Sequence, residues 1–137
     1  MDRDDLGAMF ARITRRLIAA ERPVLEAHGL SMWEYVALSR LGSGPAGTQL
    51  ALATAIGYDK TRLIALLDGL EAAGLVARAP DPGDRRAKIV RLTEAGTRRL
   101  AAARADIGAM EEEVLAELPE AERDALLRAL PVLAGKR

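Results

Sequence analysis

The most distinctive chemical groups in this sequence are basic side chains gathered in two short segments. Residues 78–91 carry a local charge of +3, because five basic residues stand against two acidic ones: Arg78, Arg85, Arg86, Lys88 and Arg91 against Asp81 and Asp84. The second segment places Lys60 and Arg62 at the start of an expected helix. Clustered guanidinium and ammonium groups bind phosphate, and arginine is drawn into the electronegative minor groove of DNA. The two segments therefore predict binding to a nucleic acid.

The charge of the whole chain, by contrast, is zero, with 20 Lys and Arg against 20 Asp and Glu. Taken alone, this balance counts against a nucleic-acid binder, which usually has a basic excess. The zero is an average over unlike regions, since residues 94–137 carry seven basic and nine acidic residues, a charge of −2. We therefore expect modest non-specific affinity for DNA, and binding that depends on how the fold places the two basic segments.

Residues suited to catalysis or metal binding are scarce. The chain has no cysteine and one histidine, His28, which excludes disulfides, thiol catalysis and cysteine redox sensing. A single histidine also gives no basis for a His-based metal cluster or a Ser/His/Asp triad. His28 precedes Gly29 at an expected helix end, where it would be a cap-region cation or a plain surface residue. We predict a protein that is not an enzyme, with no metal and no cofactor.

Length and hydropathy predict one folded domain. The 137 residues match the size of a single domain, and 50% hydrophobic with 29% charged residues is typical of a folded chain. The apolar runs are shorter than the roughly 18–20 residues of a membrane span. The polar, acidic start from Met1 to Asp5 lacks the features of a signal peptide. The expected location is cytoplasmic, with no membrane partner.

Helical periodicity dominates both ends of the chain. Apolar residues recur at spacings of four, three and four near the amino terminus: Leu6, Phe10, Ile13 and Leu17. They predict a helix over residues 4–28, which Pro23 is expected to kink or divide. Towards the other end, Thr93 is placed to cap a long helix with apolar residues three or four apart: Leu100, Ala103, Ile107, Met110, Val114 and Leu118. Pro119 is placed as the first residue of a last helix.

The central segment predicts two helices joined by a tight turn. Ser31 and Glu34 fit a capping box at the start of a preceding helix, in which the two residues satisfy each other's free backbone amides. Thr48 and Asp59 are placed to cap two further helices, with Gly57 in the turn between them. Two helices of this length around a glycine-containing turn are typical of a helix-turn-helix.

The pattern then changes period. Short runs rich in β-branched residues at 75–78 and 89–92 flank residues 79–88, which hold two prolines, a glycine and two aspartates. Two strands around a turn-rich tip predict a β-hairpin. A helix-turn-helix followed by such a hairpin is a winged helix, whose second helix fits the major groove of DNA while the hairpin reaches the backbone or the minor groove.

The hairpin and the residues after it resemble the wing of the MarR (multiple antibiotic resistance regulator) family. The family pattern Asp-Pro-x-Asp-Arg-Arg-x-Lys…Leu-Thr-x-x-Gly matches at nine positions: Asp81, Pro82, Asp84, Arg85, Arg86, Lys88, Leu92, Thr93 and Gly96. The resemblance extends over essentially the whole chain. It implies a mainly α fold with a small β-hairpin (α+β), in one domain over residues 1–137. A winged helix-turn-helix lobe at 31–96 would be flanked by dimerisation helices at 4–28 and 98–135.

The same resemblance implies a homodimeric transcriptional regulator, mostly a repressor in this family, that binds a palindromic operator in double-stranded DNA. A small, often aromatic or anionic ligand would lower its DNA affinity. Eight residues would contact DNA: Thr48, Gln49, Lys60, Thr61, Arg62, Arg85, Arg86 and Lys88. Thr48 and Gln49 would hold phosphate, and the three residues at the start of the second helix would read bases. Arg86, oriented by Asp84, would enter the minor groove.

Each of these assignments has a simpler alternative. Asp84 and Arg86 can form a surface ion pair and nothing more, and Lys60 and Arg62 can be solvated helix residues. Ala65 stands where recognition helices of the family often carry a polar or basic residue, so the outward face offers few hydrogen-bonding groups. The alternative function is therefore a winged helix that assembles with other proteins and recognises no specific operator.

A candidate ligand pocket lies where the resemblance places an effector cleft, between the dimer helices and the DNA-binding lobe. Its residues would be Phe10, Ile13, Arg16, Trp33 and Val36. Arg12, Arg15 and Arg16 would receive an anionic effector. The alternatives are that Phe10 and Trp33 belong to the core and that the arginines are charges on a dimer surface. The apolar stripes of the flanking helices also have two interpretations. They would either close the core of the monomer or form the interface of an isologous dimer.

Overall fold

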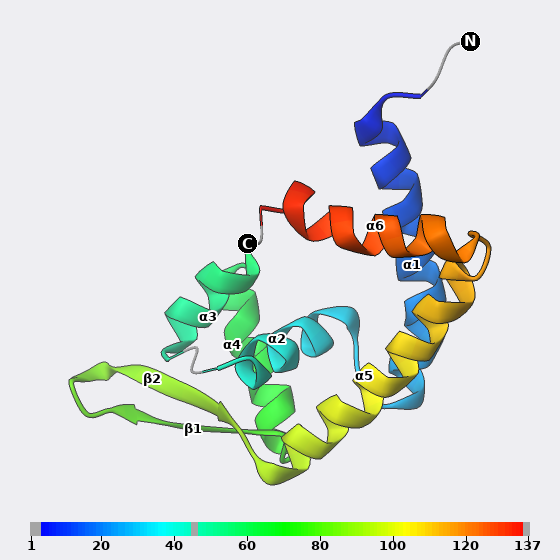
Figure 1. Cartoon of the computed structure of the whole chain (residues 1–137). Helices are drawn as coiled ribbons and strands as arrows, with labels where there is room; N and C mark the ends of the chain where they lie inside the picture. Colours follow the sequence, from blue (N-terminus) through cyan, green and yellow to red (C-terminus); the bar gives the residue numbers. More distant parts are fainter. Residues whose placement is uncertain (1–3, 45–46, 136–137) are drawn as a thin grey trace.

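The computed structural model describes residues 4–44 and 47–135, in which helices and one hairpin follow one another along the chain (Figure 1). In chain order the elements are α1 Leu6–Ala27, α2 Met32–Gly42, α3 Gln49–Ile56, α4 Lys60–Ala72, β1 Val76–Asp81, β2 Asp84–Leu92, α5 Glu94–Leu115 and α6 Glu120–Leu133. The predicted mainly α fold with a winged helix-turn-helix is confirmed. Residues 1–3 of the predicted polar amino terminus lie outside the described residues.

Side chains cap four of the helices at the residues that the sequence predicts. For α2, Ser31 Oγ accepts from the Glu34 N–H at 3.2 Å, and Glu34 Oε1 accepts from the Ser31 N–H at 2.9 Å. Thr48, Asp59 and Thr93 each accept from the amide three residues on, at 3.1, 2.9 and 3.0 Å, and cap α3, α4 and α5. These caps fix where the helices begin. They therefore orient the first turns of α3 and α4, which carry predicted DNA contacts.

Pro23 is expected from the sequence to kink or divide α1. The helix runs without interruption from Leu6 to Ala27 with Pro23 inside it, so the division is wrong. A proline removes the hydrogen bond to the carbonyl four residues earlier, here that of Ala19. Ala19 and Pro23 both lie on the exposed side of the helix. Water can therefore hydrate the free carbonyl, and the helix continues to pack along α5.

The carboxy-terminal helices differ from the prediction at their junction. Helix α5 ends at Leu115, three residues before Leu118, and Pro119 is the N-cap of α6 rather than its first residue. None of the described helices contains a stretch that is both long and apolar enough to cross a bilayer. Helix α6 has no buried residue within the single chain, so its apolar face is not covered by the described fold.

The hydrophobic core lies inside the winged-helix lobe. Six leucines are almost fully buried: Leu25, Leu38, Leu52, Leu63, Leu67 and Leu70. Leu100, Ala103 and Ile107 bring α5 into the same cluster. Helix α5 therefore belongs both to the lobe and to the flanking helical part, and it transmits the position of one to the other.

The hairpin is longer, and its turn shorter, than the sequence predicts. The strands pair antiparallel as far as Pro80, and the last pair is Asp81 with Asp84. The turn thus holds two residues, and the expected ten-residue tip is wrong. Pro80 is tolerated because each strand of a two-stranded sheet is an edge, and Asp81 Oδ1 stabilises the turn by accepting from the Gly83 N–H at 2.9 Å.

The tip of the hairpin contains a bulge in β2. The pairing passes directly from Lys88 opposite Pro80 to Asp84 opposite Asp81, so residues 85–87 have no counterpart in β1. Such a bulge bends a strand and changes the direction of its side chains. It contains both arginines of the predicted wing motif.

The base of the hairpin is fixed against the start of α5. Thr93 Oγ1 donates to the Gly74 carbonyl oxygen at 2.6 Å. At Gly96 a Cβ atom would come 2.0 Å from the carbonyl oxygen of Leu75, so glycine is required there. From this junction the hairpin extends as an arm, with its tip far from α1 and α6 (Figure 1).

Candidate nucleic-acid interface

The start of α4 presents the three predicted base-reading residues to solvent. Lys60, Thr61 and Arg62 are exposed in the first turn, whereas Leu63 and Leu67 are buried and hold the helix on the core. The first N–H groups of a helix carry a partial positive charge. This end of α4 therefore combines two cationic side chains with a favourable dipole for a polyanion.

The start of α3 is partly engaged within the protein. The Thr48 hydroxyl accepts from the Ala51 N–H at 3.1 Å, so it caps its own helix. Gln49 Oε1 accepts from Arg78 Nη1 at 3.0 Å, a contact that the sequence analysis did not predict. To a phosphate, α3 can therefore offer the side-chain amide N–H groups of Gln49 and the backbone N–H groups of its first turn.

The wing carries its predicted contacts on the exposed tip of β2. Arg85, Arg86 and Lys88 are all exposed, and the Arg86 side chain has 93% of its surface accessible. Asp84 Oδ1 accepts from the Arg86 backbone N–H at 3.0 Å and from its Nε at 3.5 Å. This contact joins the two residues that the sequence pairs, and it leaves the terminal guanidinium nitrogens facing outward.

The three elements meet at a cleft of about 340 Å³ between α3, α4 and the wing. Together with Asp84, which is predicted to orient Arg86, five of the eight predicted DNA contacts line it: Thr48, Gln49, Lys60, Arg86 and Lys88. Thr61, Arg62 and Arg85 do not line this cleft. We call it the interface cleft; it brings polar groups of α3 and cationic groups of α4 and the wing onto one concave surface.

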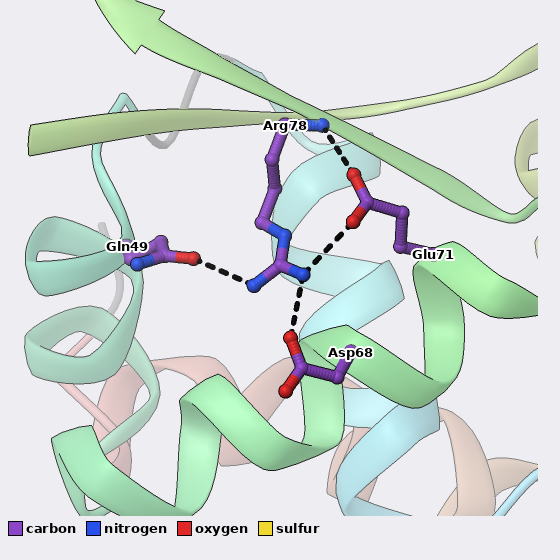
Figure 2. A network of polar contacts seen from close by, with 4 residues as sticks. All are labelled: Gln49, Asp68, Glu71 and Arg78. Carbon is purple, nitrogen blue, oxygen red and sulfur yellow. Dashed lines mark hydrogen bonds and ion pairs between the residues drawn. The ribbon is translucent and has the colours of Figure 1, made fainter.

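One basic residue of the wing does not belong to the exposed surface. Arg78, counted above in the local charge of +3, is 10% exposed and pairs with Asp68 and Glu71 of α4 (Figure 2). Its hydrogen bond lowers the pKa of Glu71 below the ordinary value, and the same bond raises the pKa of Arg78. The expectation that Arg78 adds to the DNA-binding charge is therefore wrong.

A sequence signal for this pairing exists. Asp68 and Glu71 are three residues apart and so share one face of α4. Arg78 follows two positions after Val76, which is buried, so the two lie on the same face of the strand. Two acids facing the next strand, and a base on its inner face, indicate an ion pair rather than a solvated charge.

The five predicted ligand-pocket residues do not meet in one cavity of the single chain. Trp33 lines a pocket of about 330 Å³ between α1 and α2, and its ring packs on Tyr58 with 4.5 Å between centroids. Ile13 and Arg16 line a separate, mainly apolar groove of about 380 Å³ between α1, α5 and α6. Phe10 and Val36 line neither. The prediction of one shared pocket therefore needs correction at the level of the monomer.

Two of the three α1 arginines predicted to receive an anion are also engaged. Arg16 forms a bidentate pair with Glu117, in which Nη1 donates to Oε2 at 3.0 Å. This hydrogen bond lowers the pKa of Glu117 and raises that of Arg16. Arg12 pairs with Asp4 at 3.1 Å. Arg16 therefore ties α1 to the end of α5 and is not an unpaired receptor for an anion.

His28 is the C-cap residue of α1, where the sequence places it. Its Nε2 lies 2.6 Å from Asp106 Oδ2 of α5, and Arg99 Nη1 donates to the His28 carbonyl at 2.9 Å. These contacts join the end of α1 to α5. Within the described ranges, no three His, Asp or Glu residues lie close enough to hold a metal ion.

The sequence matches a known family in its central part. The profile of the MarR family matches residues 28–87, from the end of α1 to the wing. A protein of Thauera aromatica, named as a transcriptional regulatory protein for the hcr operon, is 28% identical over 128 residues. The match covers 90% of this chain and 77% of that protein.

Solved structures match over nearly the full length. A MarR-family transcriptional regulator from Rhodococcus sp. RHA1 is 29% identical, with 96% of this chain and 93% of that chain covered and a TM-score of 0.83. The transcriptional repressor CouR, bound to a 23-mer DNA duplex, is 31% identical, with 95% and 92% covered and a TM-score of 0.81. CouR from Rhodococcus jostii RHA1 bound to p-coumaroyl-CoA is 30% identical, with 96% and 92% covered and a TM-score of 0.76.

Proposed function

The chain belongs to the MarR family of transcriptional regulators, and on this premise we propose that it binds a palindromic operator as a homodimer and represses transcription. The observation that carries the proposal is the interface cleft, where the start of α4 and the tip of the wing present cationic groups beside the polar start of α3. The proposed mechanism is binding and steric exclusion, with no chemical step. The DNA complex of CouR, a relative of similar fold, supports the same mode of action.

Each element of the cleft has a part in the proposed DNA complex. The first turn of α4 enters the major groove, where Lys60, Thr61 and Arg62 reach base edges. The starts of α3 and α4 hold phosphates of the flanking backbone. Arg86 extends into the minor groove, held in direction by Asp84. Because Ala65 adds no hydrogen-bonding group to the recognition helix, the shape of the DNA contributes to recognition alongside base contacts.

Dimerisation through the flanking helices completes the proposal. Seven large apolar side chains on α1 and α6 are exposed in the single chain: Leu6, Phe10, Ile13, Leu126, Leu127, Val132 and Leu133. An isologous dimer would bury them against the same surface of a second copy. It would also place two α4 helices about 34–36 Å apart, the spacing of one DNA turn, and so match a palindrome.

A small ligand is the proposed effector. CouR is bound to p-coumaroyl-CoA, an aromatic thioester with anionic groups. The pocket beside Trp33 offers an aromatic wall and the cation of Arg22, and Glu21 and Glu26 also line it. Burial, with a contribution from Glu111, raises the pKa of Glu21. We propose that an aromatic anion binds here between α1 and α2, completed by the partner copy, and lowers DNA affinity by moving the lobe against the dimer helices.

Selection of bound fragments from random DNA, followed by titration of the enriched sequence, tests the function. We expect a palindrome, and an affinity that falls steeply between about 50 and 200 mM salt as phosphates regain their counterions. A winged helix that serves only protein assembly would enrich no palindrome, and that outcome would remove the proposal. Repeating the titration with aromatic acids and their thioesters tests the effector separately.

A further inference from the structure

Arg78 reaches from the wing to both helices of the helix-turn-helix (Figure 2). It starts near the base of β1, and its side chain is 10% exposed. Nη2 donates to Asp68 Oδ1 at 2.6 Å and to Glu71 Oε1 at 2.9 Å, both on α4. Nη1 donates to Gln49 Oε1 at 3.0 Å, at the start of α3. We call these four residues the Arg78 network; it links three elements of the interface cleft.

The network leaves the base of the wing little freedom. Glu71 holds Arg78 twice, because its Oε2 also accepts from the Arg78 backbone N–H at 3.1 Å. A guanidinium group is planar and its donors point in fixed directions, so acceptors on two helices define both its position and its orientation. A lysine ammonium is a point charge on a flexible stem and does not impose this geometry.

Stability alone does not account for the arrangement. The Asp68 and Glu71 side chains are 62% and 41% exposed, and ion pairs with exposed partners contribute little to stability. In addition, Arg78 Nε is buried with no hydrogen-bond partner in the part of the chain that the structure describes. Arg78 also withholds a positive charge from the surface that would meet DNA. The network fixes the position of β1 relative to α3 and α4.

We propose that Arg78 is a positioning residue, which holds the wing at one angle to α3 and α4 without touching DNA. Val90 pairs with Arg78, and Arg86 lies four residues away on β2, at most about 13 Å at roughly 3.3 Å per residue. A rotation of about 10° at the base therefore moves Arg86 by up to about 2 Å, which breaks hydrogen-bond geometry. The inference rests on the proposed function, since it explains how the tip and α4 meet one DNA segment.

The position of the wing is measurable without DNA. Because the chain has no cysteine, spin labels on Gly83→Cys at the tip and Ala72→Cys at the end of α4 report one distance, with labelled chains diluted by unlabelled ones. We expect a narrow distance distribution, which Arg78→Met broadens and Glu71→Gln broadens less. The matched control is Arg98→Met, which removes an exposed ion pair inside α5 and leaves the distribution unchanged.

A double-mutant cycle on the selected DNA separates positioning from a merely structural role. We expect Arg86→Ala to weaken binding about tenfold or more in the wild-type chain but only about twofold in the Arg78→Met background, because a misplaced wing has little left to lose. Circular dichroism and size-exclusion chromatography verify that each variant is folded and of unchanged size. If Arg78 serves stability alone, the Arg86→Ala penalty is the same in both backgrounds.

The possible outcomes distinguish this inference from the proposed function. A distance distribution that stays narrow in both Arg78→Met and Glu71→Gln, or an undiminished Arg86→Ala penalty, overturns the positioning role while operator binding stands. If selection enriches no DNA, the proposed function fails and with it the link to DNA, whereas the spin-label comparison still decides whether Arg78 sets the wing.

Discussion

The tip and the base of the wing contain arginines with opposite environments. Arg86 at the tip is 93% exposed and has one local contact, to Asp84, two residues away. Arg78 at the base is 10% exposed and contacts three side chains on two helices. Both belong to one hairpin and to the same basic segment of the sequence. The exposed Arg86 is free to meet a ligand, whereas Arg78, covered and bound to two helices, holds the position of the wing.

The difference explains how a chain with no net charge can present a DNA-binding surface. The wing without Arg78 carries four basic residues against two acidic ones, and the tip cations point outward. At the base, two carboxylates of α4 are neutralised in part by Arg78, so they do not repel a phosphate backbone at full strength. The same residue that lowers the free positive charge of the wing also masks negative charge on the recognition helix.

The largest expected effect is a stability difference between base and tip glycines. We expect Gly96→Ala to destabilise the protein by about 3 kcal/mol, because its Cβ would lie 2.0 Å from the Leu75 carbonyl oxygen and the junction must move. Gly83→Ala should be nearly neutral, since its Cβ would meet Asp81 Oδ1 at an ordinary 3.6 Å. Thermal unfolding measures both. Equal melting temperatures for the two variants would show that the base is no more constrained than the tip.

The next effect separates affinity from stability. Arg86→Ala should weaken operator binding by about 10- to 100-fold, or roughly 1.4–2.8 kcal/mol, and leave the melting temperature unchanged because the side chain is exposed. Fluorescence anisotropy and thermal unfolding on the same preparation provide the two readouts. Arg15→Ala, an exposed arginine on α1, is the matched control and should change neither. Loss of stability in Arg86→Ala would contradict a purely DNA-facing tip.

A smaller effect concerns salt. Arg85 is exposed beside Arg86, and we expect it to face a phosphate rather than the strand, so Arg85→Gln should reduce the slope of log affinity against log salt by about 0.9 for each site it loses. Glu71→Gln at the base adds no phosphate contact, so its slope should equal that of the wild type even if its affinity is lower. Titrations at four salt concentrations measure the slopes. A slope that changes for Glu71→Gln and not for Arg85→Gln would reverse the roles of tip and base.

The helix starts were predicted well because they depend on contacts between residues close together in the sequence. Ser31 with Glu34, and Thr48, Asp59 and Thr93, cap helices through contacts three residues away, which a reader of the sequence can count. The division at Pro23 was wrong for a tertiary reason. Its consequence depends on which side of α1 faces water, and that is set by packing on α5.

Contacts within the candidate site could be predicted where they needed only neighbours in the chain. Asp84 and Arg86 are two residues apart, and their contact follows from spacing. Burial of Arg78 depends on acids seven and ten residues away, whose direction is known only once α4 and β1 are packed. Trp33 of α2 and Ile13 of α1 line different cavities, because the α1–α2 pocket and the groove between α1, α5 and α6 lie at different positions along α1. The sequence alone shows which residues lie on the helix but not which of them face the same cavity.

The smallest expected effect is a pH dependence confined to the base. Arg78 holds the pKa of Glu71 below its ordinary value, so the contact contributes stability that is fully present above the ordinary pKa of about 4.3 and is lost as the pH falls through the lowered pKa. We therefore expect the spin-label distribution between tip and α4 to broaden as the pH falls below about 4.3. Glu71→Gln should weaken this dependence, because its amide does not titrate, while the Asp68 carboxylate stays on Arg78.

Glu117 provides the matched control for that titration. Its pKa is also lowered, by Arg16, but this pair joins α1 to the end of α5, away from the wing. Glu117→Gln should therefore leave the pH dependence of the wing intact while changing the acid stability of the helical part. If Glu117→Gln abolished the broadening, the wing would be following general acid unfolding. Persistence in Glu117→Gln with weakening in Glu71→Gln would locate the effect at the Arg78 network. There a largely covered arginine and its acid partners set the angle at which the exposed arginine is presented.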